Sequence, residues 1–432
     1  MKIHIVGAGP TGMSLAWEIL RLGRYDITIY DRKPSAGGSW WEPRGEYRDL
    51  HAHRIVFDRA FVNTRSLFEE MKINWNDMFE PAEKDVYGFI LRSLKMKDYG
   101  VLVSLATRVL AQPQKYKSVS LKDALGELTD GGRGVLEHLP LIMDGVSWDV
   151  MSAYEFVKSF DYVAMSKQYT QRVSGKEMSD AMQKALEKKG VHFEFNRELT
   201  EVEYFEDGYS AKFKDENVIE DGMLFLCLDN SPALKFLGDN WGVDADKKVR
   251  ESTYGCINVL FDYDEPVEIG DDLEIAATTQ LKIQPVVLSD GKTISCVICN
   301  LTEEILTCPP EELRARVLEE LDVPLPKQIR FGWGSHWDGK RWTFTQSSGV
   351  LSLHGQLPFW GKCPSVAMCG MMSPRKTPFS SIEAAVEVSR ALSHECFGTR
   401  KPLQPLLLTK VLLLVILILI VLILIYRNEV SR

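Results

Sequence analysis

The stretch "KIHIVGAGPTGMSLAWEILRLGRYDITIYDRKPSAGGSWW", residues 2–41, decides the fold. It joins a short apolar strand, a glycine-rich turn, a segment with apolar residues at helical spacing and a second strand at 26–31. Strand, helix and strand in this order form a βαβ unit, whose two strands lie parallel in one sheet. The sequence therefore predicts an α/β fold that begins almost at residue 1.

The turn of this unit carries a dinucleotide fingerprint. Gly7, Gly9 and Gly12 form G-x-G-x-x-G; in that pattern the glycines permit a tight turn, close approach of a pyrophosphate and close packing of helix on strand. The N-terminus of the helix offers free N–H groups to phosphates. Asp31 ends the second strand, where a carboxylate accepts hydrogen bonds from ribose hydroxyls. We expect a bound dinucleotide, with Pro10, Thr11 and Arg32 beside it.

The composition limits the remaining classes of function. With 432 residues the chain is long enough for two or three lobes, and its net charge of −9 gives no basic surface for nucleic acid. Cys296 and Cys299 form a C-x-x-C within a strand-like segment, where residues three apart point to opposite faces. We interpret them as buried structural residues rather than a redox or metal pair. No cluster of metal ligands stands out, so no metal is expected, and the scattered cysteines fit a reducing compartment.

The C-terminal part of the chain is much more apolar than the rest. Residues 411–426 are apolar without a break, and Leu406–Leu408 extend the run past a single Lys410. A run of about 20 apolar residues spans the hydrocarbon core of a bilayer, which is about 30 Å thick. Met1 leads straight into the first strand, without a signal peptide. We therefore expect a single-pass tail anchor that contacts lipid over 406–426. The catalytic part would face the cytosol, at the endoplasmic reticulum or the outer mitochondrial membrane.

Between these ends the pattern predicts six segments. Residues 1–73, 171–240 and 351–402 show strands and helices typical of a nucleotide-binding domain, residues 74–170 are mainly helical, and residues 241–350 alternate as in an antiparallel sheet. Residues 403–432 are a linker and the expected anchor.

From residue 171 onward the chain resembles the flavin-containing amine oxidase family, which has the glutathione-reductase-type FAD fold. "GVHFEFNRELTEV" (190–202) is similar to the family strand that touches adenine, and the resemblance places Leu199 at that contact. "AMCGMMSPRKTPFSSIEAAVEVSRAL" (367–392) is similar to the family's closing motif, with Gly370 at the end of a strand. In that motif Ser381 and Ile382 start a helix aimed at the flavin. Ser380 and Glu383 also have the spacing of a capping box.

The resemblance implies a Rossmann-like FAD-binding domain, an α+β substrate domain and, with the anchor, one transmembrane helix. It places Gly37, Gly38 and Ser39 against the cofactor. No S-G-G-C-Y segment for covalent attachment is present, so FAD would be bound non-covalently. The chain also departs from the family: the best match to the lysine near flavin N5 is Asn258. Two of the usual glycines of the closing motif are replaced as well.

The expected chemistry is oxidation of a small-molecule substrate by hydride transfer to the flavin. Only one dinucleotide fingerprint is present, which disfavours an NAD(P)H-dependent enzyme with a second Rossmann site. "DLHAHRIVF" (49–57) falls where relatives run past the flavin, so His51, His53 and Arg54 are candidates to face flavin or substrate. Exposed histidines are the equal alternative.

A tryptophan-rich segment offers a second set of cavity residues. "FGWGSHWDGKRWTFTQ" (331–346) contains Trp337 and Trp342, which either wall the substrate cavity or pack in the core or on a sheet surface. Two other functions remain open. One is a non-catalytic or degenerate FAD-binding membrane protein, and the other is a flavoenzyme resembling UDP-galactopyranose mutases.

Overall fold

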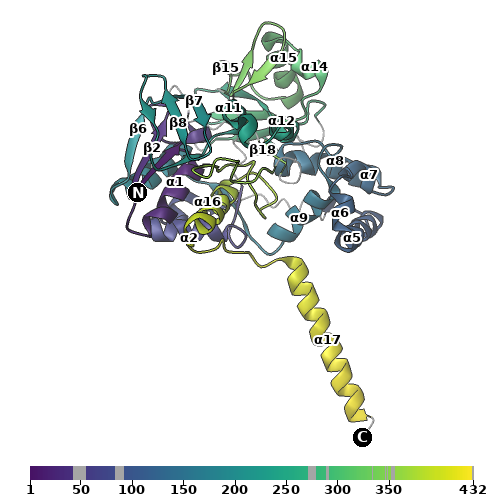
Figure 1. Ribbon diagram of the computed structural model, residues 1–432. Coiled ribbons are helices and arrows are strands. Elements are labelled where there is room, and N and C mark those ends of the chain that lie inside the picture. The colour runs from purple at the N-terminus through teal and green to yellow at the C-terminus, as the bar shows by residue number, and fades with distance from the viewer. Residues whose placement is uncertain are drawn as a thin grey trace.

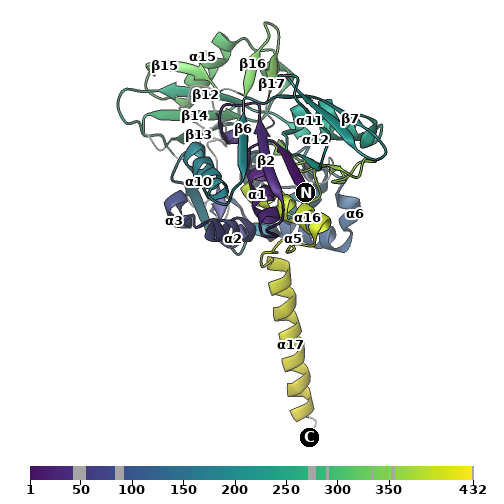
Figure 2. The same cartoon turned by 60° about the vertical axis from the view of Figure 1, so that its left-hand side comes forward.

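The computed structural model describes residues 1–41, 55–82, 92–270, 279–288, 291–332, 334–345, 347, 349–351 and 356–430. These residues form a body from which one helix, α17 (Leu408–Val430), projects (Figure 1). An antiparallel sheet lies at the end of the body opposite α17, and both views show the nucleotide-binding elements between them (Figure 2).

The centre of the body is a five-stranded parallel sheet in the order β19-β10-β1-β2-β6. Its strands come from the three segments that the sequence assigns to the nucleotide-binding domain. This sheet confirms the Rossmann-like α/β fold. The strands are β1 (Lys2–Val6), β2 (Asp26–Asp31), β6 (His192–Phe195), β10 (Met223–Leu226) and β19 (Val366–Met368).

Both faces of this sheet are buried. Ile5 and Phe225 point into a core with the helices, while Val6 and Leu226 point into a second core on the other face. This double burial explains why β1 and β10 read as apolar runs. The first face carries α1 (Pro10–Leu20), α2 (Val62–Met71), α10 (Gly175–Glu187) and α16 (Ile382–Phe397). The second carries β7 (Leu199–Tyr204), β8 (Tyr209–Phe213), β9 (Val218–Ile219), α11 (Asn230–Leu237) and α12 (Ala245–Ser252).

The segment expected to be helical forms a separate core around Leu105, Leu136 and Phe156. Its helices are α3 (Trp75–Met78), α5 (Met96–Ala111), α6 (Pro113–Tyr116), α7 (Leu121–Ala124), α8 (Asp130–Asp144) and α9 (Ala153–Val163). A small sheet in the order β3-β5-β4 joins this part to the nucleotide-binding part. It contains β3 (Val56–Phe57), β4 (Phe79–Pro81) and β5 (Gln168–Gln171).

The antiparallel sheet expected within 241–350 has the order β13-β14-β12-β15. Its members are β12 (Ile257–Asp262), β13 (Ile283–Val287), β14 (Thr293–Ile298) and β15 (Gln328–Phe331), with α14 (Glu303–Leu306) and α15 (Pro310–Leu321). Two short ladders complete this part: β16 (Ser335–Trp337) with β17 (Trp342–Phe344), and β11 (Thr253–Tyr254) with β18 (Gly349–Val350).

The two cysteines of the C-x-x-C motif lie apart from each other. Cys296 is buried in β14, as expected, and Cys299 lies beyond the end of that strand and is partly exposed. Ile257 and Ile298 are opposite each other in the antiparallel register, and the Cys299 thiol is hydrogen-bonded to that of Cys256. The neighbour of Cys299 is therefore Cys256, which the sequence did not single out.

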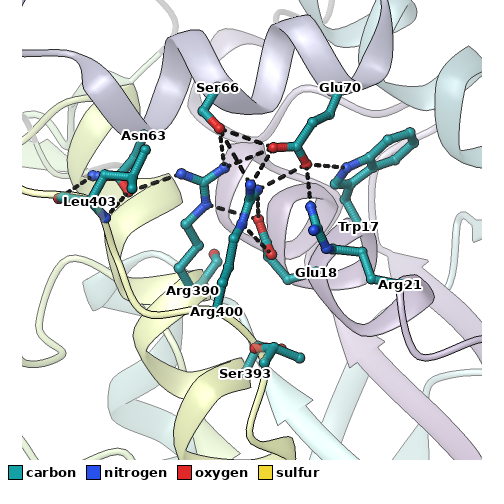
Figure 3. A network of polar contacts seen from close by, with 12 residues as sticks. Trp17, Glu18, Arg21, Asn63, Ser66, Glu70, Arg390, Ser393, Arg400 and Leu403 are labelled. Carbon is teal, nitrogen blue, oxygen red and sulfur yellow. Dashed lines mark hydrogen bonds and ion pairs between the residues drawn. The ribbon is translucent and has the colours of Figure 1, made fainter.

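The C-terminal linker is fixed to the body before α17 begins. Arg400 binds the carboxylates of Glu18 and Glu70, on α1 and α2 respectively (Figure 3). Asn63 exchanges hydrogen bonds with the backbone of Leu403, at 2.8 and 3.0 Å.

In the ranges given above, no helix is both long enough and apolar enough to cross a membrane. The side chains at 416, 420 and 424–430 lie outside the described part of α17. The transmembrane helix expected over 406–426 is not confirmed and stays a prediction.

Candidate functional site

A cavity of about 390 Å³ lies at the carboxyl ends of the parallel strands, where open α/β sheets bind their ligands. A cavity of this size is in the range of small-molecule and cofactor sites. Residues from all three nucleotide-binding segments line it. The predicted cofactor residues among them are Gly7, Gly9, Pro10, Thr11, Asp31, Arg32, Gly38, Ser39, Leu199, Gly370, Ser381 and Ile382.

The glycine turn has no room for side chains. Gly7 has φ +114°, and a Cβ there would lie 2.1 Å from the carbonyl oxygen of Cys227. A Cβ on Gly12 would lie 2.0 Å from the carbonyl oxygen of Gly7. Gly9 is the N-cap of α1, and no side chain in the described part of the protein caps this helix. The first-turn N–H groups of α1 therefore remain available for an anionic ligand.

Gly37 and Gly38 pack against the glycine turn. Gly38 packs against Gly9 so closely that a Cβ on Gly38 would lie 2.8 Å from the Gly9 Cα. The Gly37 N–H donates to the carbonyl of Ala8 at 3.0 Å. Gly12 and Gly37 were expected to touch the cofactor, but neither is among the residues that line the cavity. Close backbone packing is what requires glycine at these two positions.

Asp31 braces the same turn. Its side chain is buried, and its two oxygens accept hydrogen bonds from the backbone N–H groups of Ala8 and Lys33, at 2.7 and 2.9 Å. The second lone pair of each oxygen is left for a ligand such as a ribose. Lys33 donates to the Gly38 carbonyl at 2.6 Å, and burial lowers the pKa of its ammonium group to about 8.

The start of α16 differs in detail from the capping box expected of Ser380 and Glu383. The N-cap is Ser381, whose hydroxyl accepts from the Ala384 N–H at 3.2 Å. Ser380 instead accepts from the backbone of Val350 at 3.0 Å. The cavity-facing helix start therefore lies one residue later than the sequence spacing indicated.

The Glu383 side chain caps α2 rather than its own helix. It is fully buried, and its carboxylate accepts four hydrogen bonds from the backbone and side chains of Asn63 and Thr64, at 2.7–3.0 Å. These residues form the first turn of α2, so Glu383 satisfies N–H groups that α2 cannot pair internally. This long-range contact explains why Glu383 does not cap its own helix.

The wall of the cavity also holds an acidic residue that the sequence did not single out. Asp144 is the last residue of α8, lines the cavity and is 8% exposed. One of its oxygens accepts from the Ser380 N–H, and Oδ2 has no hydrogen-bond partner among the described residues. Burial and the nearby Glu155 carboxylate raise the pKa of Asp144 well above its usual range. Tyr254, Cys299 and Gln284 line the same region.

Of the residues predicted to act in catalysis, the structure describes only Trp337. His53 and Arg54, with His51, lie outside the described residues. Trp337 is on β16, where its ring lies 5.7 Å from that of Trp342, and neither tryptophan lines the cavity. Aromatic packing within the hairpin, the alternative considered for these residues, is what the structure contains.

Asn258 was matched to the family's lysine, but its side chain accepts from the Ser295 hydroxyl at 3.0 Å inside the antiparallel sheet. It does not line the cavity; Gln284 of the same sheet does.

Comparisons with known proteins agree with this fold. Residues 5–62 match the model of the NAD(P)-binding Rossmann-like domain. Comparison of the sequence with characterised proteins finds no match.

Solved structures resemble the chain over nearly its whole length. An oxidoreductase from Methanosarcina mazei has 14% identity and a TM-score of 0.63, covering 91% of this chain and 100% of its own. A putrescine oxidase variant has 15% identity and a TM-score of 0.63, covering 92% and 98%. A provisionally assigned protoporphyrinogen oxidase from Exiguobacterium has 12% identity and a TM-score of 0.57, covering 91% and 98%. At these identities the comparisons show the fold.

Proposed function

We propose that this protein is an FAD-dependent oxidoreductase that oxidises a small-molecule substrate. The observation that carries the proposal is the single cavity into which the glycine turn, the Leu199 segment and the start of α16 all converge. When bound, the flavin supplies an acceptor for a hydride from the substrate.

The residues present fit FAD along the whole cavity. The uncapped first turn of α1 would hold the pyrophosphate, and Asp31 would accept from the adenosine ribose. Leu199 would contact the adenine, as the resemblance implies. The N-terminus of α16 at Ser381 and Ile382 would face the flavin ring and stabilise the negative charge of its reduced form.

The structural neighbours support the oxidase class but do not identify the substrate of this protein. One is a putrescine oxidase and another is described as an oxidoreductase, and both share the fold over nearly their whole length. We place this protein in the amine-oxidase-like class of flavoenzymes, with a substrate whose carbon donates a hydride. We expect the flavin to be bound non-covalently.

The test uses the full chain, purified in detergent. Acid precipitation should release all flavin into the supernatant. Primary amines, diamines, amino acids and primary alcohols are then added anaerobically, and bleaching of the flavin absorbance by any of them supports the oxidoreductase. Flavin that stays oxidised with the whole panel would favour an FAD-binding protein without turnover. A chain that purifies without flavin would refute the cofactor assignment.

We also propose that residues 406–426 anchor the protein in a membrane, with residues 1 to about 402 in the cytosol. The unbroken apolar run at 411–426 supports this, together with the exposure of its large side chains; Leu413, for example, is 66% exposed. The endoplasmic reticulum and the outer mitochondrial membrane are the two expected sites. Protease added to intact membranes should remove the flavin domain, and full protection would refute this topology.

A further inference from the structure

The cavity contains one buried carboxyl group with an oxygen that no described group satisfies. Asp144 ends α8, and Gly145, which also lines the cavity, follows it with φ +69°. The backbone N–H of Ser380 donates to the Asp144 carboxylate. That contact fixes the carboxyl group beside the start of α16, while Oδ2 is left without a partner among the described residues.

The surroundings of Asp144 are specific. Gly145 packs so tightly that a Cβ there would lie 3.1 Å from the Tyr254 ring and 3.2 Å from the Cys299 sulfur. Tyr254, Cys299 and Asp144 all line the cavity. Any side chain at position 145 would push the two neighbours away, so this glycine keeps the wall around Asp144 closed.

Charge is distributed unevenly around this carboxyl group. Glu155, on α9, is 1% exposed and acts on Asp144 as a like charge. Arg375 provides the compensating positive charge, and its guanidinium donates to the backbone carbonyls of Val350 and Thr377, at 2.9 and 3.1 Å. Three carboxyl groups, those of Asp144, Glu155 and Glu387, thus act on one guanidinium. Glu387 also accepts hydrogen bonds from Lys376 and Thr377. Of the other two carboxyl groups, one is best accommodated with a proton, because a further unpaired charge is costly in a buried site.

We propose that Asp144 is the acid–base residue of the oxidation: its Oδ2 accepts the proton that the substrate's N–H or O–H loses. This proposal rests on the proposed function. The substrate is an amine or alcohol with a hydrogen on the carbon next to the heteroatom. It would lose a hydride from that carbon, for which bound FAD would supply the acceptor, and a proton from the heteroatom, which Asp144 would accept. A C=N or C=O bond forms, and Asp144 then returns its proton to water.

The environment suits this role. Burial and Glu155 raise the pKa of Asp144, and Arg375 opposes them. A raised pKa makes the carboxylate a stronger base than an exposed aspartate, which brings it closer to the range useful for catalysis near neutral pH. The Tyr254 and Cys299 side chains keep their protons, because burial raises the pKa of Tyr254, and a hydrogen bond with Cys256 raises the pKa of Cys299. As the pH rises, Asp144 therefore loses its proton before Tyr254 and Cys299 do.

The first arm of the test needs no substrate. Infrared spectra of the full chain, loaded with FAD in detergent, are recorded as a function of pH, and the Asp144→Asn spectrum is subtracted from that of the wild type. The difference should contain the carbonyl band of a protonated carboxylic acid, and this band should persist to a pH above the usual range of an aspartate. The subtraction is needed because the pKa of the buried Glu383 is also raised. Asp144→Asn should retain the flavin, because the amide oxygen still accepts from Ser380. Asp149→Asn, which changes an exposed acid close by, should leave the band in place. A difference spectrum without this band would overturn the proposal.

The second arm measures anaerobic flavin reduction by the donor that the substrate panel identifies. For the wild type the rate should rise with pH through the pKa of Asp144. Asp144→Asn should slow reduction by about 100-fold, the usual scale of general base catalysis, and abolish this rise. Asp144→Glu should restore part of both. An unchanged rate and pH profile in Asp144→Asn would overturn this proposal alone. Failure of every donor with the wild type would refute the proposed function and this proposal with it.

Discussion

At the scale of single residues, Asp31 shows how a ligand-binding side chain also serves the fold. Both of its oxygens already accept from backbone N–H groups of the glycine turn and of Lys33. Asp31→Ala would leave one buried and one partly buried donor unsatisfied. We therefore expect it to lower the free energy of unfolding of the flavin-free protein by about 1–3 kcal/mol, besides weakening FAD binding.

Chemical denaturation of flavin-free protein checks this expectation. Asp26→Ala, at the exposed start of the same strand, is the matched control and should change stability by less than about 0.5 kcal/mol. Equal stability of Asp31→Ala and wild type would mean that the turn holds without these two hydrogen bonds.

Glu383 gives a prediction of pH dependence. Burial raises its pKa from 4.5 to about 7, against the four hydrogen bonds from Asn63 and Thr64 that favour the charged form. A carboxyl group whose pKa is raised by folding stabilises the native state fully below its unfolded pKa. That contribution is lost as the pH rises toward the folded value. Between pH 4.5 and 7 the loss amounts to roughly 3 kcal/mol.

Glu383→Gln has no proton to lose in this range. We expect its unfolding free energy, measured by denaturation at several pH values, to fall less steeply than that of wild type between pH 4.5 and 7. Its absolute stability is lower, because the amide group replaces one accepting oxygen by a donor. Parallel curves for the two proteins would show that Glu383 titrates normally.

Single residues were predictable from the sequence where a local pattern determines their role. The glycines and Asp31 belong to one short turn, and their identities follow from its geometry. Asp144 belongs to no motif, since it meets Ser380 and Glu155 only through the packing of α8 on distant elements. The Ser380 capping box failed for the same reason, because Glu383 is drawn into a contact with α2.

At the scale of elements, α1, α2 and α16 are joined by a buried ionic network that also holds the linker (Figure 3). Glu18 is fully buried and accepts from Arg390 at 2.8 Å and from Arg400 at 2.5 and 3.0 Å. Removing one partner of a buried ion pair leaves an uncompensated charge. Glu18→Ala should therefore destabilise the protein by about 3–5 kcal/mol and expose the linker to protease.

The control lies in the same network. Arg21 binds Glu70 at 2.8 Å, but its side chain is about half exposed, so Arg21→Ala should cost less than about 1 kcal/mol. Denaturation midpoints and the rate of linker cleavage compare the two variants. Similar losses for both would mean that burial adds nothing to the Glu18 pairs.

Elements followed the sequence pattern more closely than did individual contacts. The βαβ unit, the helical segment and the antiparallel sheet all lie where periodicity and turn residues place them. The role of the tryptophan hairpin could not be predicted, because a run of aromatic residues is compatible with a cavity wall and with packing between two strands. The register of β16 on β17 places Trp337 opposite Trp342 and so determines that they pack on each other.

At the scale of the whole molecule, the stability of a shortened chain should depend on the residue at which it ends. A chain that ends after Pro405 keeps the contacts of Arg400 and Leu403 but loses two hydrogen bonds from Thr409 to the buried Asp161. Its body should therefore unfold at a denaturant concentration slightly below that of the full chain. A chain that ends after Gly398 loses Arg400 and should be less stable by at least about 1 kcal/mol. Both should bind FAD if the cavity alone determines binding.

Sedimentation with membranes completes this comparison. If residues 406–426 are the anchor, both shortened chains should stay in the supernatant while the full chain sediments. A chain ending after Pro405 that still sediments would place the membrane contact in the body.

The order of strands in the central sheet determines when the nucleotide-binding domain can finish folding during synthesis. β1 is synthesised first, but in the sheet it lies between β2 and β10. The helix α16, which packs against α1, is synthesised hundreds of residues later. The hydroxyl of Ser389 on α16 donates to the carbonyl of Thr11, 378 positions earlier in the chain. Such distant pairings form slowly, because long loops must close before their contacts stabilise anything. The emerging chain should therefore carry an unfinished nucleotide domain until α16 has been synthesised. We expect it to rely on chaperones until then and to acquire its cofactor only afterwards.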